Sequence, residues 1–257
     1  MDLIADHISH RFGALDVLDN VSFTVSAGEV VAIVGPSGCG KSTLLSILGG
    51  LLAPSAGGAS LRGAPPAGSL NPLTFVFQDF ALLPWSTVEA NVEFPLLHTR
   101  LSAHERRASV DDALRRTGLS DFRAAYPKQL SGGMRQRVGI ARALAVRPAI
   151  LLMDEPLSAL DSQTRELLME DFIGLLADGT MGAVYVTHNL EEAVRLADRI
   201  VVLSRRPGRI REIVTMPLPR SRRGETSARE QLLQLQNDLW ALIRGEAVDA
   251  EREVQDA

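Results

Sequence analysis

Residues 35–43, with the sequence GPSGCGKST, constrain the fold of this chain more than any other stretch. They fit the pattern G-x-x-x-x-G-K-[ST], and they lie between the apolar runs 29–34 and 44–48. Glycines at these positions let backbone N–H groups converge on phosphate oxygens at a helix N-terminus, where the helix dipole favours an anion. Lys41 would add a positive charge near the β- and γ-phosphates, and the Ser42 hydroxyl suits Mg²⁺. This stretch, called the phosphate loop below, predicts a strand, a phosphate-binding loop and a helix, rather than a glycine-rich turn that binds nothing.

The composition limits the class of protein. With 257 residues the chain can bury a sizeable core, as one large domain or as a core with an inserted subdomain. A net charge of −4 gives no long-range attraction to nucleic acid, and we expect no nucleic-acid partner. The N-terminus does not fit a signal peptide, and no apolar run approaches the ~20 residues that span a bilayer. We therefore expect a cytoplasmic protein, in keeping with its single cysteine, Cys39, and any membrane role must come through a partner.

The first third of the chain is expected to be rich in β-structure. The apolar runs that predict strands are 3–8, 17–25, 29–34 and 73–77. A helix is predicted at 43–51, and the Ala-, Gly- and Pro-rich segment 53–72 predicts turns with at most a short strand. Gln78 follows the last of these strands. Phe12 stands outside any clean alternation, which is typical of a core or turn residue, and an adenine-stacking role is the alternative.

From residue 79 the sequence changes to helix signals. Ser86–Glu89 and Ser102–Glu105 each fit a capping box, and Gly118 is placed to end the second helix. Before the first box lies Phe80–Trp85, an unusually apolar loop. Its side chains either fill the core of a small helical subdomain or form an exposed groove that accepts a helix of a partner, and the sequence favours neither.

A further helix is expected to begin at Leu130–Met134. Ser131 and the two glycines after it stand at the start of this helix, where they would cap it or present N–H groups to an anion. The arginines that follow, Arg135, Arg137 and Arg142, are equally consistent with a solvated basic face.

Polar residues follow two apolar strands at the point where each strand ends. The run 149–153 lacks alternation, as expected for a parallel strand buried on both faces, and leads into Asp154 and Glu155. An acidic residue at this end of a parallel strand suits Mg²⁺, and a second carboxylate could orient or deprotonate a water molecule. The run 183–187 is followed in the same way by His188. We interpret Asp154, Glu155 and His188 as candidate site residues.

The C-terminal part adds further elements. Ser158–Asp161 leads into a helix at 162–177, Asn189 starts another helix, and 199–203 predicts a strand. Basic turns at 205–211 and 220–223 are either solvated or meet phosphates. Leu232, Leu235, Leu239 and Ile243 recur at helical spacing and predict an amphipathic helix that packs back on the domain, followed by a frayed acidic end at 245–257.

Taken in order, these motifs resemble the nucleotide-binding subunit of an ATP-binding cassette (ABC) transporter, over roughly residues 3–215. The set consists of the phosphate loop, Gln78, Leu130–Met134, Asp154-Glu155, Ser158–Asp161 and His188. The resemblance implies an α/β fold with a phosphate-loop NTPase core of mostly parallel sheet flanked by helices, an N-terminal antiparallel β subdomain and an inserted α-helical subdomain. We expect the core and β subdomain at 1–78 and 149–204, the helical subdomain with the signature motif at 79–148, and a C-terminal extension at 205–257.

The resemblance also implies a role for each matching residue, with ATP and Mg²⁺ bound in a head-to-tail dimer of two copies. Glu155 would act on the attacking water, helped by His188, Gln78 and Lys41. Asp154, Ser42 and Gln78 would contact Mg²⁺. The residues implied to bind ATP are Phe12 at the adenine, Gly35, Pro36, Ser37, Gly38, Cys39, Gly40, Lys41, Ser42 and Thr43 at the phosphates, and Ser131, Gly132, Gly133 and Asp161 of the opposite copy.

Within this family the chain looks most like the ATPases of the nitrate/sulfonate/taurine importers. The likeness rests on residues 38–40, 77–79, 82–85 and 206–210. It implies ATP hydrolysis that drives solute uptake through separate transmembrane permease subunits, served indirectly by a solute-binding protein. The chain would then be peripheral on the inner face of the cell membrane.

Three alternatives remain: a non-transport ATPase of the same superfamily, a phosphate-loop kinase of a small metabolite, and a nucleotide-gated subunit without turnover. Chromosome-maintenance members separate the phosphate loop from the signature by long coiled coils, whereas 87 residues lie between Ser42 and Leu130 here. A kinase would leave Leu130–Met134 and His188 without a role, and Glu155 argues against a subunit without turnover. The sequence does not specify the solute.

Overall fold

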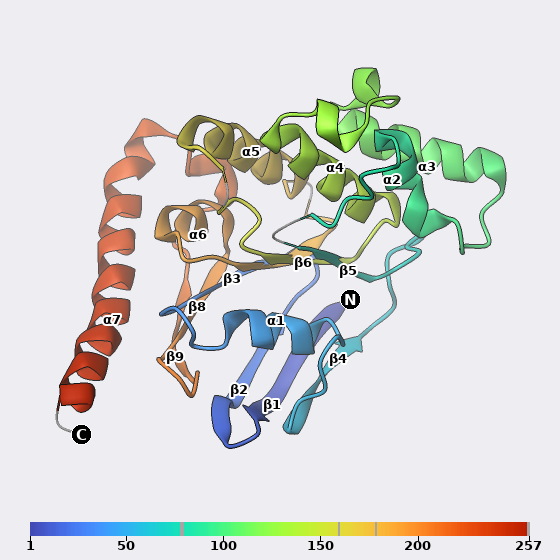
Figure 1. Ribbon diagram of the computed structural model, residues 1–257. Helices are drawn as coiled ribbons and strands as arrows, with labels where there is room; N and C mark the ends of the chain where they lie inside the picture. Colours follow the sequence, from blue (N-terminus) through green and yellow to red (C-terminus); the bar gives the residue numbers. More distant parts are fainter. Residues whose placement is uncertain (78–79, 159, 178, 256–257) are drawn as a thin grey trace. The chain divides into compact units, whose positions relative to one another are not determined.

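The computed structural model describes residues 1–77, 80–158, 160–177 and 179–255 (Figure 1). The chain divides into two units, one formed by residues 1–64 and 182–257 and the other by residues 65–181. Each unit is described by itself. The domain boundaries expected from the sequence stay a prediction.

The first unit begins with an antiparallel sheet. Its strands lie in the order β2-β1-β4, with Leu3 of β1 opposite Val25 of β2 on one side and Leu61 of β4 on the other. The apolar residues Leu3, Ala5 and Ile8 of β1 are buried, as in a sheet with one face toward the core, and His10 of the same strand is also buried. The strands are β1 Asp2–Phe12, β2 Leu15–Val25 and β4 Ala56–Arg62.

The same unit contains a group of mostly parallel strands. β3 lies between β7 and β8 and is parallel to both, and β9 pairs with β8 in the antiparallel direction. Every residue of β3 and β7 is buried, which explains their unbroken apolar sequences. The sequence predicted β3, β7 and β8 but not β9, which follows a turn rich in arginine. The strands are β3 Val30–Val34, β7 Gly182–Val186, β8 Arg199–Leu203 and β9 Ile210–Thr215.

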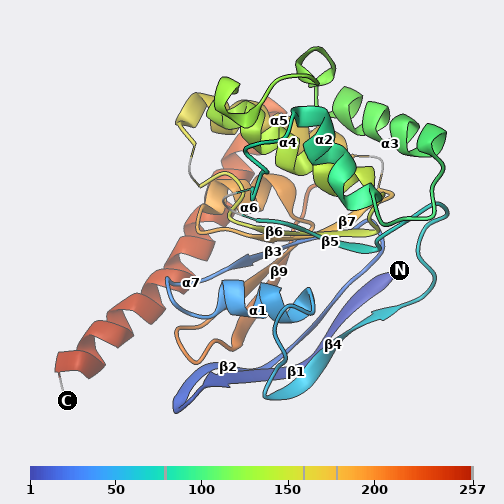
Figure 2. The same cartoon turned by 45° about the vertical axis from the view of Figure 1, so that its right-hand side comes forward.

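Helix α1, Lys41–Leu48, lies between this parallel group and the antiparallel sheet (Figure 2). Its apolar residues Leu44, Leu45, Ile47 and Leu48 are buried. Because the phosphate loop joins β3 to α1, the loop stands at the carboxyl end of a buried strand and at the N-terminus of a buried helix. This is the strand, loop and helix that the sequence predicted.

The C-terminal helix α7, Arg229–Gln255, packs on helix α6, Leu190–Leu196 (Figure 1). Leu232 and Leu239 are buried in one cluster with Leu190 and Ala193, and Leu235, Leu242 and Ile243 pack against it. The amphipathic spacing in the sequence therefore marks a helix that packs back on its own unit, as predicted. One-turn helices at Arg220–Arg222 and Thr226–Ala228 lead into α7.

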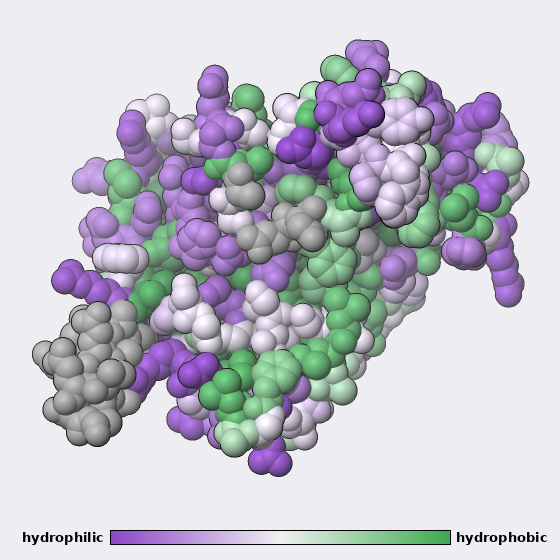
Figure 3. All heavy atoms as spheres, in the orientation of Figure 1, coloured by the Kyte–Doolittle hydropathy of each residue, from purple (hydrophilic) through white to green (hydrophobic). Residues whose placement is uncertain are grey.

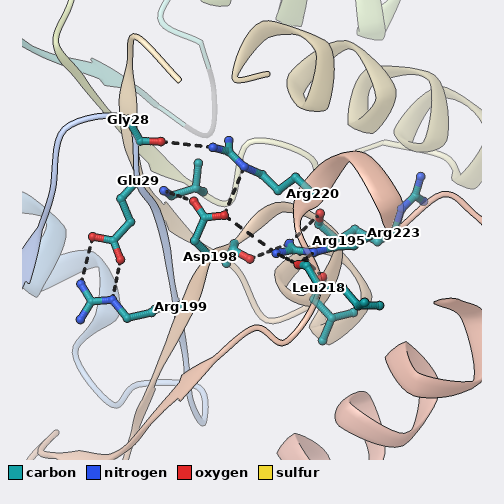
Figure 4. Close-up of polar contacts among 11 residues, drawn as sticks. Gly28, Glu29, Arg195, Asp198, Arg199, Leu218, Arg220 and Arg223 are labelled. Carbon is teal, nitrogen blue, oxygen red and sulfur yellow. Dashed lines mark hydrogen bonds and ion pairs between the residues drawn. The ribbon is translucent and has the colours of Figure 1, made fainter. Parts of the chain in front are cut away.

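Arg223 fixes the segment before α7 to the end of α6 (Figure 4). Its side chain is only 5% exposed, and burial lowers its pKa to about 10, so it is protonated at neutral pH. The last carbonyl groups of a helix lack partners within the helix, and a buried guanidinium can supply them. Arg223 donates hydrogen bonds to the carbonyl oxygens of Val194, Arg195, Ala197 and Leu218.

Asp198 links the same segment to β3. Its carboxylate accepts a hydrogen bond from the Val30 N–H at 2.9 Å and lies 3.3 Å from Nε of Arg220. Arg220 also donates to the carbonyl oxygen of Gly28 at 3.1 Å, and Figure 4 shows its side chain reaching across from the turn before α7. The sequence left open whether the basic turn at 220–223 is solvated or contacts phosphates. In the structure, Arg220 and Arg223 of this turn instead hold it to other parts of the same unit.

The second unit contains two parallel strands and the helices of the middle of the chain. Thr74 of β5 lies opposite Leu151 of β6. Helices α2, α3 and α4 pack on one another. The elements are β5 Leu73–Val76, β6 Ile150–Asp154, α2 Val88–Glu93, α3 Ala103–Arg116, α4 Gly132–Ala145 and α5 Ser162–Leu175, with one-turn helices at Phe94–Leu96, Ser120–Phe122 and Pro127–Gln129.

The helix caps agree closely with the sequence. Ser102 and Glu105 form the predicted capping box of α3, and Gly118 follows its end with φ +67°. At α2 the prediction was wrong by one residue, because Thr87 rather than Ser86 caps the helix and accepts from the Ala90 N–H. Either hydroxyl could fill this role, so the sequence could not separate them.

The surface is mixed in character. Figure 3 shows apolar residues gathered over the lower end of the antiparallel sheet. Leu15 and Leu61, in β2 and β4, are among the exposed large apolar residues. In the described ranges, every helix is too short or too polar to cross a bilayer.

Candidate nucleotide-binding site

At several positions the phosphate loop has a backbone conformation that residues with a side chain rarely adopt. Gly35, Gly38 and Gly40 have φ values of +157°, +76° and +103°. A Cβ on Gly35 would lie 2.8 Å from the carbonyl oxygen of Leu203, and one on Gly40 would lie 2.8 Å from a methyl group of Leu18. The glycines therefore let the loop fold tightly against β2 and the end of β8. Ser37 and Gly38, by contrast, are exposed.

Lys41, the first residue of α1, lies back over the loop. Its Nζ donates hydrogen bonds to the carbonyl oxygens of Gly35 and Pro36, both at 2.9 Å, and its side chain is buried. A positive charge is thus held within the curve of the loop. Burial raises the pKa of the neighbouring Cys39 thiol, an effect that the charge of Lys41 partly opposes. Cys39 is therefore a protonated, buried thiol at neutral pH.

The N-terminus of α1 offers oxygen and N–H groups to a phosphate and its metal ion. Ser42 is exposed there, beside Thr43, and the first N–H groups of any helix have no partner inside the helix. In the part of the chain that the structure describes, no group of three His, Cys, Asp or Glu side chains could hold a metal ion. Mg²⁺ usually takes one or two protein oxygens together with substrate phosphates and water, so a single hydroxyl fits this ion.

Phe12 ends β1 with its side chain 53% exposed. Its ring meets the ring of His10 edge to face, with centroids 4.6 Å apart and planes at 79°. His10 is buried beneath it. Phe12 is therefore a supported aromatic surface, and the structure does not make it a core residue.

His188 follows β7 and is exposed. The backbone next to it is held from below by Glu192, a buried carboxylate that accepts hydrogen bonds from the hydroxyls of Tyr185 and Thr187, each at 2.8 Å. Thr187 in turn accepts from the Asn189 N–H at 3.0 Å, and Asn189 caps α6 as predicted. The sequence analysis missed the role of Glu192 as the buried anchor of this segment, because its hydroxyl partners come near it only in the folded chain.

Asp154 ends β6 in the second unit and Glu155 follows it, and both residues are half-buried. Glu155 has φ +44°, a left-handed conformation that is uncommon for a residue with a side chain and that concentrates at functional sites. The Ser158 hydroxyl donates to the carbonyl oxygen of Glu155 at 2.9 Å and helps to hold this conformation. The direction of the Glu155 side chain is thus set by a strained, braced backbone.

The segment Leu130–Met134 lies against the start of α5. Ser131 caps α4 by accepting from the Met134 N–H at 3.2 Å, which is the capping role that the sequence allowed. A Cβ on Gly133 would lie 2.6 Å from the methyl group of Thr164, so α4 and α5 approach closely only because Gly133 has no side chain. Gly132 is more loosely placed, with Leu160 3.7 Å from such a Cβ.

Asp161 caps α5 by accepting from the Thr164 N–H at 3.0 Å, and this hydrogen bond lowers the pKa of the Asp161 carboxyl group. The structure thereby brings together two of the predicted motifs, the signature around Ser131 and the loop before α5. Both Ser131 and Asp161 are exposed. Gln78, to which the sequence assigned a role at the metal ion and the water, lies outside the described residues.

The apolar loop Phe80–Trp85, called the docking loop below, is held firmly at both ends. Asn91 is fully buried; its side chain accepts from the Leu83 N–H at 2.8 Å and donates to the carbonyl oxygens of Leu83, Ser86 and Thr87. Arg142 donates to the carbonyl oxygens of Phe80 and Ala81. The Phe80 side chain approaches Gly139 of α4.

Trp85, by contrast, is 74% exposed. The sequence left open whether the side chains of the docking loop fill a core or are exposed, and the Trp85 side chain does not fill a core. Asn91 was missed by the sequence analysis, because its partners are backbone groups of a loop that only the folded chain brings near.

The fold and the phosphate loop define a phosphate-loop NTPase. A profile of the family described as ABC transporter matches residues 18–158. A taurine import ATP-binding protein of Burkholderia pseudomallei is 48% identical over 200 residues, which are 78% of this chain and 77% of the relative. An uncharacterized ABC transporter ATP-binding protein of Methanocaldococcus jannaschii is 46% identical over 205 residues, or 80% and 77% of the two chains. The chain belongs to the ABC transporter family, as its ATP-binding component.

A solved structure supports the same assignment. The dimeric, post-hydrolysis state of an ATP-binding cassette bound to ADP and Pi is similar to this chain with a TM-score of 0.71 and 34% sequence identity. The match covers 84% of this chain and all of the other. The predicted fold class is therefore confirmed.

Proposed function

We propose that this chain hydrolyses ATP to drive the uptake of a solute through separate transmembrane permease subunits. The observation that carries the proposal is the phosphate loop, with Lys41 and Ser42 at the start of α1, in a member of the ABC transporter family. The taurine import protein among its relatives supports an importer over a non-transport ATPase or a metabolite kinase. The permease and an external solute-binding protein would choose the solute, and the chain would act on the inner face of the cell membrane.

ATP and Mg²⁺ are the ligands that we assign to the phosphate loop. Backbone N–H groups of the loop and of the first turn of α1 suit the β- and γ-phosphates, with the charge of Lys41 beside them. Phe12 offers its exposed ring to the adenine. The Ser42 hydroxyl is an oxygen ligand of the kind that Mg²⁺ prefers, and we propose the Asp154 carboxylate as a second such ligand. When bound, Mg²⁺ supplies positive charge against the negative charge that develops on the transferred phosphoryl group.

Glu155 is the residue that we assign to the attacking water. A carboxylate can accept the proton of the water as it attacks, and the braced backbone of Glu155 would keep that carboxylate in one direction. His188 and Gln78 would orient the water and the γ-phosphate. The buried Glu192 network beneath His188 supports this role, because it fixes the backbone from which the imidazole extends.

We further propose that the complete site forms between two copies in a head-to-tail dimer. Ser131, Gly132 and Gly133 of one copy would face the γ-phosphate held by the phosphate loop of the other, with Asp161 beside them. The packing of the signature segment against the start of α5 supports this, because it makes Ser131 and Asp161 parts of one surface. ATP would then hold the dimer together, and hydrolysis would remove the contacts of its γ-phosphate.

The docking loop is the surface that we assign to the permease. An exposed Trp in a loop whose backbone is fixed by Asn91 and Arg142 is a suitable anchor for a helix of a partner, because binding costs little ordering. Closure of the dimer would reach the permease through this loop.

The proposal is tested with Glu155→Gln in the full chain, assayed for phosphate release, for ATP binding and for dimer formation with ATP. We expect turnover to fall by at least about 100-fold, since a positioned base contributes this much, while ATP binding is kept and an ATP-bound dimer accumulates. Glu170→Gln, on the exposed face of α5, is the matched control and keeps wild-type turnover. Near-normal hydrolysis by Glu155→Gln would remove Glu155 from this role, and transfer of phosphate to a metabolite would indicate a kinase.

A further inference from the structure

The turn that joins β8 to β9 lies directly beneath the phosphate loop. This turn, residues 204–209 and called the brace turn below, pairs with β2: the Gly208 N–H donates to the carbonyl oxygen of Val17 at 2.8 Å. The carbonyl oxygen of Gly208 accepts from the Asp19 N–H at 3.0 Å. The sequence analysis noted residues 206–210 as a mark of likeness to one importer group, and the basic turn 205–211 as either solvated or in contact with phosphates. The proposed ATPase function leaves them without a task.

The brace turn is also closed on itself. Ser204 exchanges backbone and side-chain contacts with Arg209: its N–H donates to the carbonyl oxygen of Arg209 at 2.9 Å, and its hydroxyl accepts from the Arg209 N–H at 3.0 Å. The Ser204 hydroxyl also lies 3.2 Å from the carbonyl oxygen of Pro207. Arg209 pairs with Asp19 of β2, with Nε 2.8 Å from the carboxylate. The position of Gly208 is therefore fixed from both sides.

Gly208 leaves no room for a side chain. It is buried, and a Cβ built on it would lie 2.2 Å from the carbonyl oxygen of Cys39 and 3.3 Å from a methyl group of Leu18. The first distance is far below any contact that a real Cβ makes, and the obstacle is backbone, which cannot rotate away as a side chain can. Leu18 is also the residue that meets Gly40, so loop, β2 and brace turn form one close-packed stack.

A single peptide group connects the contact between Gly208 and Cys39 to the side of the phosphate loop that would face the nucleotide. The carbonyl oxygen of Cys39 and the N–H of Gly40 belong to the same planar, trans peptide, so they point in opposite directions. Because the oxygen faces the brace turn, the Gly40 N–H points away from it. Gly40 is the N-cap residue of α1, where N–H groups are available to an anion.

We propose that Gly208 is a positioning residue for nucleotide binding, and that the brace turn aims the Gly40 N–H by its contact with the Cys39 carbonyl oxygen. The inference rests on the proposed binding of ATP by the phosphate loop. A side chain at 208 pushes the Cys39 carbonyl and turns the Gly40 N–H with it. The binding free energy that is lost belongs to contacts with the phosphates of the nucleotide and not to contacts with its adenine.

The test compares wild type, Gly208→Ala and the matched control Gly224→Ala in the full chain. Gly224 lies in the same unit, and a Cβ there would meet nothing within 4 Å. The dissociation constants for ATP and for inorganic tripolyphosphate are measured in EDTA, which prevents turnover. We expect Gly208→Ala to raise both constants by the same factor, at least about tenfold, the size expected for one hydrogen bond to a charged group. For Gly224→Ala we expect both dissociation constants to stay within about twofold of the wild-type values, which is the effect expected of a surface substitution.

Cys39 supplies a second readout, because it is the single cysteine and is buried. Its rate of reaction with a thiol reagent reports the state of the loop at the point of contact. We expect faster labelling in Gly208→Ala and the wild-type rate in Gly224→Ala. A turn that serves only the stability of the fold would lower the midpoint of thermal unfolding without changing the affinity of the folded protein or the labelling rate at low temperature.

Wild-type affinities and labelling in a folded Gly208→Ala variant overturn the inference. If Gly208→Ala does not fold, Ser204→Ala takes its place: it removes the hydroxyl that closes the turn and adds no clash. We then expect both dissociation constants to rise by about threefold, less than the loss of a full hydrogen bond, and unchanged constants overturn the inference. A wild-type chain that binds neither ATP nor tripolyphosphate would instead contradict the proposed function itself.

Discussion

The guanidinium group of Arg223 donates a hydrogen bond to the carbonyl oxygen of Ala197 at 2.6 Å. Arg223 precedes the C-terminal helix, and Ala197 is the residue at which α6 ends, so this contact joins two parts of the chain that the sequence separates by 25 residues. The charge is buried, yet its donors meet the carbonyl groups that the end of a helix leaves without partners. The contact makes the C-terminal segment a part of the first unit.

Replacing Arg223 by Met should therefore destabilise the protein. We expect the free energy of unfolding to fall by about 3 kcal/mol, because the carbonyl groups and Asp198 lose a buried partner. Arg222→Met is the matched control: Arg222 is mostly exposed and forms an exposed ion pair with Glu225, so we expect a change of less than about 0.5 kcal/mol. Urea unfolding of both variants checks the prediction. Equal stabilities for the two variants would show that Arg223 is not the anchor.

Trp85→Ala should spare the nucleotide site and weaken assembly with the permease. Trp85 is exposed, while the backbone of the docking loop is held by Asn91, so removal of the indole changes a surface and not the fold. We expect unchanged affinity for ATP and at least about tenfold weaker co-purification with the permease, typical of the loss of a central aromatic anchor. Trp240→Ala, at the exposed Trp of α7, is the control. Unaltered assembly would leave Trp85 without a role in docking.

The stability of the protein should fall above about pH 9 in a way that depends on Cys39. Burial raises the pKa of this thiol above its ordinary value of 9.0, so in this range the folded chain keeps a proton that the unfolded chain loses. The stabilising contribution is complete below pH 9.0 and is lost as the pH rises through the raised pKa of the folded state. We expect the free energy of unfolding of wild type to decline more steeply between pH 8 and pH 10 than that of Cys39→Ala. Parallel declines would contradict the effect of burial.

The sequence predicted the elements whose signal is local. The phosphate loop, the apolar strands β3, β6 and β7, and the caps at Ser102, Ser131 and Asn189 depend on short patterns, and the structure contains them. A strand buried on both faces is apolar throughout, and a cap needs one side chain at one position, so neither requires knowledge of distant residues.

Features that depend on tertiary contact were missed or left open. β9 mixes polar and apolar residues without a regular alternation and is defined by its pairing with β8. The sequence could not predict the exposure of Trp85, since an apolar loop has the same sequence pattern whether it is packed or exposed. Gly208 and Arg223 show no local signal of their roles, because the Cys39 carbonyl and the end of α6 come near them only in the folded chain.

The candidate site was predictable as a set of residues but not as an arrangement. Ser131 and Asp161 were assigned from motifs, and the structure places their segments together through Gly133 and Thr164. The left-handed backbone of Glu155 had no signal in the sequence, because such a conformation at a residue other than glycine is imposed by its surroundings. The functional roles of these residues stay predictions.

The central claim is that two copies of this chain hydrolyse ATP at sites shared between them, and one mixing experiment tests it most directly. Lys41→Ala removes the charge of the phosphate loop, and Ser131→Arg blocks the signature segment. Phosphate release is measured for each variant alone and for an equal mixture. A head-to-tail dimer predicts that each variant alone is inactive and that the mixture recovers about a quarter of wild-type activity, because half of the dimers are mixed and each has one intact site of two. A mixture as inactive as its components would contradict a shared site, and activity of Lys41→Ala alone would contradict hydrolysis at the phosphate loop.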